Sequence, residues 1–160
     1  MTETEIAMRL ALATLGAMLL GLDRELRGIS AGLRTHGIVG LSSALITISA
    51  LLLYESLHSG GSNPDVDPLR VVQGLAQAVG FIAAGAIFVS GGNVHNLTSA
   101  ANLWLAAAVG IAAGAGQMRL AIIGLLIGLV LITLVRLLER YVLGGKQQGR
   151  DVRDDAPPGS

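Results

Sequence analysis

Five apolar runs, each about as long as a membrane's hydrocarbon core is thick, dominate this sequence of 160 residues. An α-helix rises about 1.5 Å per residue, so a helix of about 20 residues crosses a layer about 30 Å thick. Short polar connectors separate the runs, as expected for helices that cross a membrane back and forth. We therefore predict an all-α polytopic membrane protein with transmembrane helices over residues 6–22, 37–57, 69–89, 100–117 and 120–138.

The two ends of the chain differ in character. Residues 1–5 lack the positive charge that precedes a cleaved signal peptide, so we expect the first apolar run to remain as a helix. Residues 144–160 are polar and charged and contain Gly and Pro, which predicts a disordered tail. Residues 1–143 then form one transmembrane domain.

Basic residues are divided unevenly between the two faces of the membrane. Three of them, Arg9, Arg70 and Arg119, fall on one face. The other face receives Arg24, Arg27, Arg34, Arg136, Arg140, Lys146, Arg150 and Arg153. Because positively charged loops stay in the cytoplasm, we predict that the N-terminus lies outside and the C-terminus in the cytoplasm. The Arg9 side chain either reaches the headgroups or belongs to an ion path, and the first is the simpler interpretation.

Glycine is abundant and aromatic residues are scarce, with 22 glycines and 3% aromatics. Membrane helices that touch closely favour such small residues, often at G-x-x-x-G spacing. We predict helix packing at Gly80, Gly85, Gly110, Gly114, Gly124 and Gly128. The last four form two G-x-x-x-G pairs, which could also join two copies in a homodimer, although this spacing is common by chance.

Residues 21–36 concentrate charge between the first two apolar runs. Asp23 and Glu25 fall at the predicted C-terminus of a helix, the negative end of its dipole, so they need a cation nearby. Arg24, Arg27 or Arg34 would supply it through ion pairs, and the alternative is a bound divalent cation such as Mg²⁺, with Asp23 and Glu25 as its ligands.

The second and fourth helices are both predicted to begin on the cytoplasmic side, with Thr35 or His36 and Thr98 or Ser99 as N-caps. Helix N-termini attract anions, so an anionic ligand or a lipid headgroup fits there. We predict one polar pocket where residues 21–36 meet residues 90–99. Its candidate residues are Asp23, Arg24, Glu25, Arg34, Thr35, His36, Asn93, His95, Thr98 and Trp104.

Several function classes find no support in the sequence. The net charge is zero, which gives no basic field for nucleic acid, and cysteine is absent. No phosphate-binding lysine loop, G-x-S-x-G or H-E-x-x-H motif is present, so we expect no enzyme and no catalytic residue. Asp65 and Asp67 could bind Mg²⁺ or Ca²⁺, but aspartate beside proline is more simply a turn.

A weak internal repeat relates residues 30–34, Ser-Ala-Gly-Leu-Arg, to residues 99–104, Ser-Ala-Ala-Asn-Leu-Trp. Each segment opens a predicted helix on the same side of the membrane. Two parallel helical hairpins followed by a fifth helix would explain the match, and a shared bias toward small residues would explain it equally.

Spaced motifs over about residues 16–117 resemble those of the MgtC/SapB family of bacterial membrane proteins. Gly-Leu-Asp-Arg-Glu at 21–25 and Ala-Gly-Leu-Arg-Thr-His at 31–36 are similar to the family's first signature. Asp-Pro-Leu-Arg at 67–70, Gly-Phe-Ile-Ala-Ala-Gly at 80–85 and Leu-Thr-Ser-Ala-Ala-Asn-Leu-Trp at 97–104 follow in the family's order. Asp23 stands where the family usually has Glu, and His95-Asn96 where a basic residue and glycine are common.

The resemblance implies an inner-membrane protein of five spans that acts in magnesium homeostasis and, in some pathogens, in survival inside host cells. Some members are described as acting by binding membrane partners such as the F-type ATP synthase. The soluble C-terminal domain of longer members has no counterpart in these residues. We therefore expect a non-enzymatic factor of Mg²⁺-linked cation homeostasis, embedded among lipids, with an oligomeric ion transporter or channel as the alternative.

Overall fold

The computed structural model describes residues 1–29, 31–59, 67–90, 93–138 and 141, and it gives the backbone alone for Phe88, Ser90, Asn93 and Val94. The predicted tail at 144–160, Ser30 of the repeat and Asp65 lie outside these residues. Within them are five helices, each long and apolar enough to cross a membrane. They are α1 (Glu3–Leu26), α2 (Leu33–Ser59), α3 (Leu69–Ala86), α4 (Leu97–Gly114) and α5 (Met118–Leu138). The predicted helical membrane fold is confirmed.

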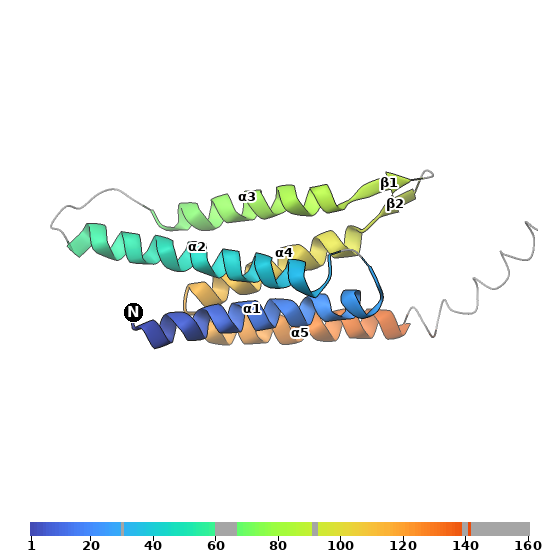
Figure 1. Cartoon of the computed structure of the whole chain (residues 1–160), viewed down its shortest axis with the longest axis horizontal. Helices are drawn as coiled ribbons and strands as arrows, with labels where there is room; N and C mark the ends of the chain where they lie inside the picture. The colour runs from blue at the N-terminus through green and yellow to red at the C-terminus, as the bar shows by residue number, and fades with distance from the viewer. Residues whose placement is uncertain (30, 60–66, 91–92, 139–140, 142–160) are drawn as a thin grey trace, which may run out of the picture. The chain divides into compact units, whose positions relative to one another are not determined.

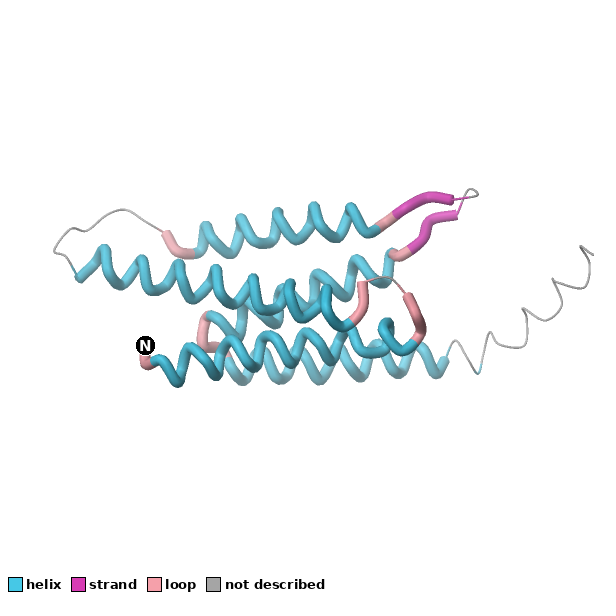
Figure 2. Tube along the Cα trace, in the orientation of Figure 1, coloured by secondary structure: helices cyan, strands magenta, loops and turns pink. Residues whose placement is uncertain are grey.

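A short β-hairpin joins α3 to α4, where the sequence predicted the end of a helix and a polar break (Figure 2). Strands β1 (Phe88–Ser90) and β2 (Asn93–His95) pair antiparallel, with Phe88 opposite His95. Asn96 follows in the left-handed region with φ of 67°. Its side-chain amide donates to the Ala86 carbonyl at 3.2 Å, which ties the hairpin to the end of α3.

Local side chains set where the helices begin. The Thr2 hydroxyl accepts from the Glu5 N–H at 3.2 Å, as in a capping box, so α1 starts earlier than predicted. Before α3, an Asp67 carboxylate oxygen accepts from the Leu69 N–H at 2.9 Å. Asp67 thus makes the turn that its position beside Pro68 favours.

The chain divides into two compact units, residues 1–126 and 127–160, with the boundary inside α5. In the first unit, consecutive helices α1 and α2 are antiparallel, as are α3 and α4, so that α2 and α4 run in the same direction (Figure 1). In the second unit, residues 127–138 continue α5 as a helix, and the Thr133 hydroxyl donates to the Leu129 carbonyl at 2.8 Å.

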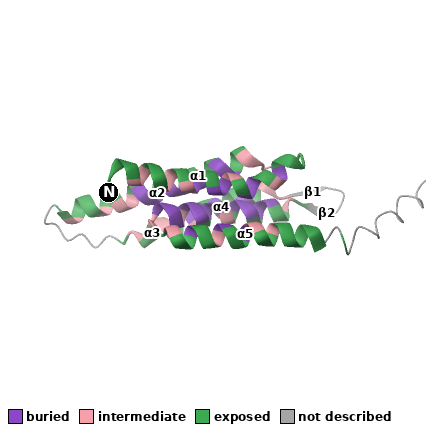
Figure 3. Ribbon diagram, turned by 90° about the horizontal axis from the view of Figure 1, so that it is seen from below, coloured by how far each residue is buried: buried purple, intermediate pink, exposed green. Residues whose placement is uncertain are grey.

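Glycine brings α1, α2 and α4 into backbone contact. A Cβ added at Gly40 of α2 would collide with the Ala17 side chain and would lie 2.7 Å from the Ala13 carbonyl oxygen of α1. On α4, a Cβ at Gly110 would collide with the Gly40 carbonyl, and one at Gly114 would lie 2.7 Å from the Ala44 carbonyl oxygen. The buried residues of the first unit gather along these three helices (Figure 3). Gly110 and Gly114 therefore contact α2 of their own chain, so they do not offer a surface to a second copy.

Three of the other predicted packing glycines lie in more open surroundings. A Cβ at Gly80 would have the Trp104 ring nitrogen as its nearest neighbour, at 4.0 Å. A Cβ at Gly85 or Gly124 would meet nothing within 4 Å among the described residues, so neither is packed closely within the chain. Gly128 belongs to the second unit.

Arg9 differs from the predicted extension toward the headgroups. Its guanidinium pairs with Glu5 and donates to the Gly114 carbonyl at 2.8 Å, and its side chain is 12% exposed. The turn after α4 makes room for it at Gly116, where φ is 78° and a Cβ would lie 2.6 Å from the Arg9 Nη2 atom. A cation beside the last carbonyls of α4 also suits the negative end of that helix.

Candidate functional site

The turn between α1 and α2 forms one wall of the candidate site. Gly28, with φ of 64°, ends α1: its N–H donates to the Glu25 carbonyl at 3.1 Å, and the Ile29 N–H donates to the Arg24 carbonyl at 3.0 Å. The Glu25 carboxylate then accepts from the Leu33 N–H at 3.0 Å, the first residue of α2. Since α2 begins at Leu33, the predicted N-caps Thr35 and His36 are wrong, and a carboxylate from α1 satisfies this helix start.

His36 lies inside the packed end of the bundle and is fully buried. Its Nδ1 atom is 2.9 Å from the Gly32 carbonyl oxygen, which can only accept, so Nδ1 carries the proton of that hydrogen bond. The His36 ring can pack against α1 because residue 21 is glycine, where a Cβ would lie 2.9 Å from the imidazole ring. The other ring nitrogen, Nε2, is buried without a hydrogen-bond partner in the described part of the chain.

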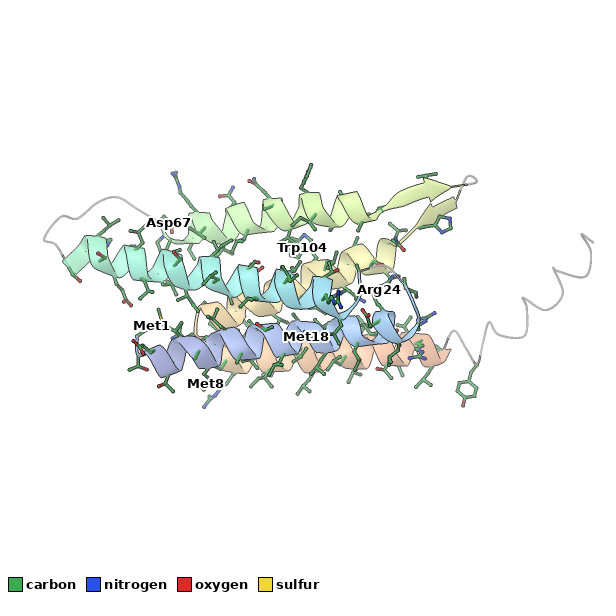
Figure 4. The ribbon with its side chains drawn as sticks, viewed as in Figure 1. Met1, Met8, Met18, Arg24, Asp67 and Trp104 are labelled. Atoms are coloured by element: carbon green, nitrogen blue, oxygen red, sulfur yellow. The ribbon has the colours of Figure 1, made fainter. Side chains whose placement is uncertain are left out.

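Arg24 occupies the last turn of α1 and is 7% exposed. Figure 4 shows it where the end of α1 meets the starts of α2 and α4. Asp23, beside it in sequence, makes an ion pair with Arg27 at 3.6 Å. Within the cluster predicted for residues 21–36, Arg24 is therefore buried, whereas Arg27 is exposed and Asp23 is partly buried.

Helix α4 contributes two buried polar residues that the predicted pocket did not include. Ser99 is fully buried and Asn102, one turn later, is 7% exposed. The Ser99 hydroxyl has no hydrogen-bond partner among the described residues. By contrast, the hydroxyl of Thr47 donates to the carbonyl four residues earlier in its helix, at 2.7 Å. Ser99 lies in the first turn of α4, so the residue four positions earlier, His95, lies outside the helix.

The packing of α2 against α4 places their starts at the same end of the bundle. Gly110 packs on Gly40 and Gly114 on Ala44, so the two helices run parallel with a constant offset in sequence. At the same offset of seventy residues, Ser99 and Asn102 lie level with residues 29 and 32, immediately before the first turn of α2, which contains His36. The candidate site, called the polar end cluster below, consists of Arg24, His36, Ser99 and Asn102.

The remaining predicted pocket residues lie elsewhere. Glu25, Arg34, Thr35, His95 and Thr98 are exposed, and the Asn93 side chain is outside the described atoms. The predicted caps of α4 are also wrong, because that helix begins at Leu97 after the left-handed Asn96. A polar i, i+3 pair inside an apolar run, Ser99 with Asn102, was the sequence signal for the missing members.

Trp104 belongs to a different feature, an apolar groove of about 250 Å³ between α3 and α4. Figure 4 shows its side chain between these helices. The groove is lined by Val72, Leu75, Ala76, Val79, Trp104, Ala107, Ala108, Ile111, Ala112, Gln117 and Leu120. Ten of these lining residues are apolar, so the groove offers an ion almost no ligands.

Metal ligation by Asp23 and Glu25 was the other prediction. The two carboxylates are engaged by Arg27 and by the Leu33 N–H. Across the described ranges there is no cluster of three or more His, Cys, Asp or Glu side chains that could hold a metal ion. Magnesium at this position stays a prediction.

The comparisons with known proteins agree with the motifs in the sequence. A family model described as the MgtC family matches residues 10–141. The chain belongs to the MgtC family. It is 37% identical over 128 residues to the protein named "Putative magnesium transporter YhiD" of Escherichia coli K12, an alignment that covers 80% of this chain and 59% of that protein.

Two further members of the MgtC family show the same relationship. The protein SapB of Bacillus subtilis is 32% identical over 157 residues, covering 94% of this chain and 65% of SapB. The protein MgtC of Brucella abortus is 41% identical over 98 residues, covering 61% of this chain and 37% of that protein. This chain thus spans less than two thirds of the length of these relatives. No solved structure matches it.

Proposed function

We propose that this chain is an inner-membrane factor of Mg²⁺-linked cation homeostasis that regulates or binds a membrane protein partner and does not move ions itself. Membership of the MgtC family and the name of the Escherichia coli relative support the link to magnesium. The excess of Lys and Arg at the polar end cluster's side supports a cytoplasmic position for the cluster and for the C-terminus, with the N-terminus outside.

The observation that carries the proposal is a pair of buried polar atoms without partners at one end of a closely packed bundle. His36 Nε2 and the Ser99 hydroxyl are both in this state within the described residues, and both lie in first turns of parallel helices. Leaving such a group unsatisfied costs about 1–3 kcal/mol. A bundle that retains two of them close to a buried arginine has two polar atoms available for binding.

The polar end cluster suits an anionic group that carries both acceptor oxygens and a hydroxyl donor, such as a protonated phosphate, because His36 Nε2 accepts when Nδ1 holds the proton. Arg24 contributes a guanidinium, Ser99 a hydroxyl, and the starts of α2 and α4 contribute the positive ends of two helix dipoles. A bare Mg²⁺ ion would be repelled by the Arg24 charge. We therefore place the magnesium link in the partner or in a magnesium-bound anion, and give Asp23 and Glu25 a structural role.

Ion transport is the second candidate, favoured by the name of the Escherichia coli relative. The packing of the first unit opposes it. Where a path would run between α1, α2 and α4, Gly40 contacts Ala17 on one side and Gly110 on the other. The groove between α3 and α4 is open but apolar. Neither offers the ring of oxygen ligands that a dehydrating cation requires.

Replacing Ser99 by alanine tests the proposal, because it removes a buried hydroxyl that has no partner. We expect the free energy of unfolding to stay the same or to rise by about 1 kcal/mol. We also expect the variant to lose its ability to restore growth in low Mg²⁺ to a bacterium that lacks its own member of the family. Growth and the amount of protein in the membrane are measured together.

The matched control is Ser42→Ala, since Ser42 is exposed on α2 and belongs to no site. It should restore growth as well as the unmodified chain does. A Ser99→Ala variant that restores growth fully would show that the polar end cluster is not the working site.

A further inference from the structure

The outward face of α3 carries two glutamines and several small residues among exposed apolar side chains such as Phe81, and α3 is long and apolar enough to cross a membrane. Its inward face, toward α4 and α2, is apolar and includes Leu75, Val79 and Ala83, which are buried. On the opposite face lie Arg70, Gln73, Gly74, Gln77, Ala78, Phe81, Ala84 and Gly85, all of them exposed. Figure 4 shows a row of side chains on α3 that point away from the other helices.

Gln77 is the residue on this face for which contact with lipid is least favourable. It is the ninth of the 18 residues of α3, and therefore lies near the middle of the span. A glutamine side chain is too short to reach water from there. Hydrocarbon offers its amide no hydrogen bond, and leaving the amide unpaired is unfavourable. Another protein surface on this face would provide the missing partner.

Small residues beside Gln77 allow a second helix to come close. Gly74 and Ala78 are four residues apart on the same face, a small-x-x-x-small arrangement that lets helix backbones approach. A Cβ at Gly74 or at Gly85 would meet no atom within 4 Å among the described residues, so the space beside them is open. In α2 and α4 the corresponding glycines are covered by a neighbouring helix of the same chain.

We propose that this face of α3 binds the same face of a second copy of the chain, as a two-fold symmetric dimer within the membrane. An amide both donates and accepts, so Gln77 can pair with Gln77 of a second copy across the axis. The charges at the end of α3 are also self-complementary. Asp67 and Arg70 are both exposed, and in a parallel α3 pair each can meet the opposite charge of the other copy.

The chain has no cysteine, so single cysteines report the contact without background. Ala78→Cys places a thiol on the proposed interface near the middle of α3. Ser42→Cys and Ser49→Cys place thiols on the exposed face of α2, as matched controls in another span. In native membranes treated with an oxidant, we expect Ala78→Cys to form a disulfide-linked dimer and both controls to stay monomeric.

Gln77→Leu removes the amide while retaining an apolar side chain that lipid tolerates, so the fold of the chain should survive. In liposomes, energy transfer between labelled copies should show the dimer dissociation constant raised about tenfold by this change, which is the effect of losing one interhelical hydrogen bond pair. Unchanged dimerisation of Gln77→Leu would overturn the proposal. Cross-linking of Ser42→Cys to the same extent as Ala78→Cys would also overturn it. So would an Ala78→Cys product that contains a different protein, or an Ala78→Cys chain that stays monomeric among lipids.

Discussion

Valine at Gly40 is expected to disrupt the packing of the first unit. Gly40 lies between α1 and α4, and even a Cβ there would collide with Ala17 and come within 2.7 Å of the Ala13 carbonyl oxygen. The atoms in the way belong to backbone and to a one-carbon side chain, so no rotamer change relieves them. We expect a loss of about 3 kcal/mol in the free energy of unfolding, measured by denaturation in detergent micelles.

Gly124→Val is the matched control for this substitution. Gly124 lies in a helix of the same unit, and a Cβ there would meet nothing within 4 Å among the described residues. Its variant should unfold within about 1 kcal/mol of the unmodified chain. If Gly40→Val is as stable as Gly124→Val, then α1, α2 and α4 do not pack through Gly40 as described.

Leucine at Arg24 is expected to abolish function. The Arg24 side chain lies in the packed end of the bundle and is attracted by the negative charge of Asp23, so its removal should also lower the free energy of unfolding. In the proposed function, its guanidinium is the group that holds an anionic ligand or partner. The growth of a host dependent on the protein in low Mg²⁺ should fall to that of the empty strain, with growth compared at equal amounts of protein in the membrane.

Arg34→Leu provides the comparison, because Arg34 belongs to the same charged segment but is exposed on α2. We expect it to support growth nearly as well as the unmodified chain. Loss of function in Arg34→Leu with full function in Arg24→Leu would move the working site from the buried cluster to the surface of the turn.

The helical class could be predicted from the sequence because length and apolarity are enough to identify a span. Which faces meet could not. The spacing of Gly110 and Gly114 indicates a close contact, but their partners, Gly40 and Ala44, belong to a helix seventy residues earlier. Nothing in the sequence around residues 40–44 or 110–114 indicates that these two segments meet, because their contact depends on the path of the whole chain.

Only part of the candidate site could be predicted from the sequence. Arg24 and His36 fall within the charged segment that the sequence brings to attention, and the structure buries both. Ser99 was interpreted as a cap because serine usually caps helices, but Asn96 takes that position in a left-handed conformation. Similarly, the cap of α2 comes from Glu25, eight residues before Leu33, which propensities at the helix start cannot reveal.

Magnesium uptake by liposomes that contain the purified chain tests the central claim most directly. The dye-reported entry of Mg²⁺ should equal that of protein-free liposomes, because α1, α2 and α4 close on one another and the α3–α4 groove is apolar. Saturable Mg²⁺ entry that disappears in Asp23→Ala would contradict this account and identify the chain as a transporter.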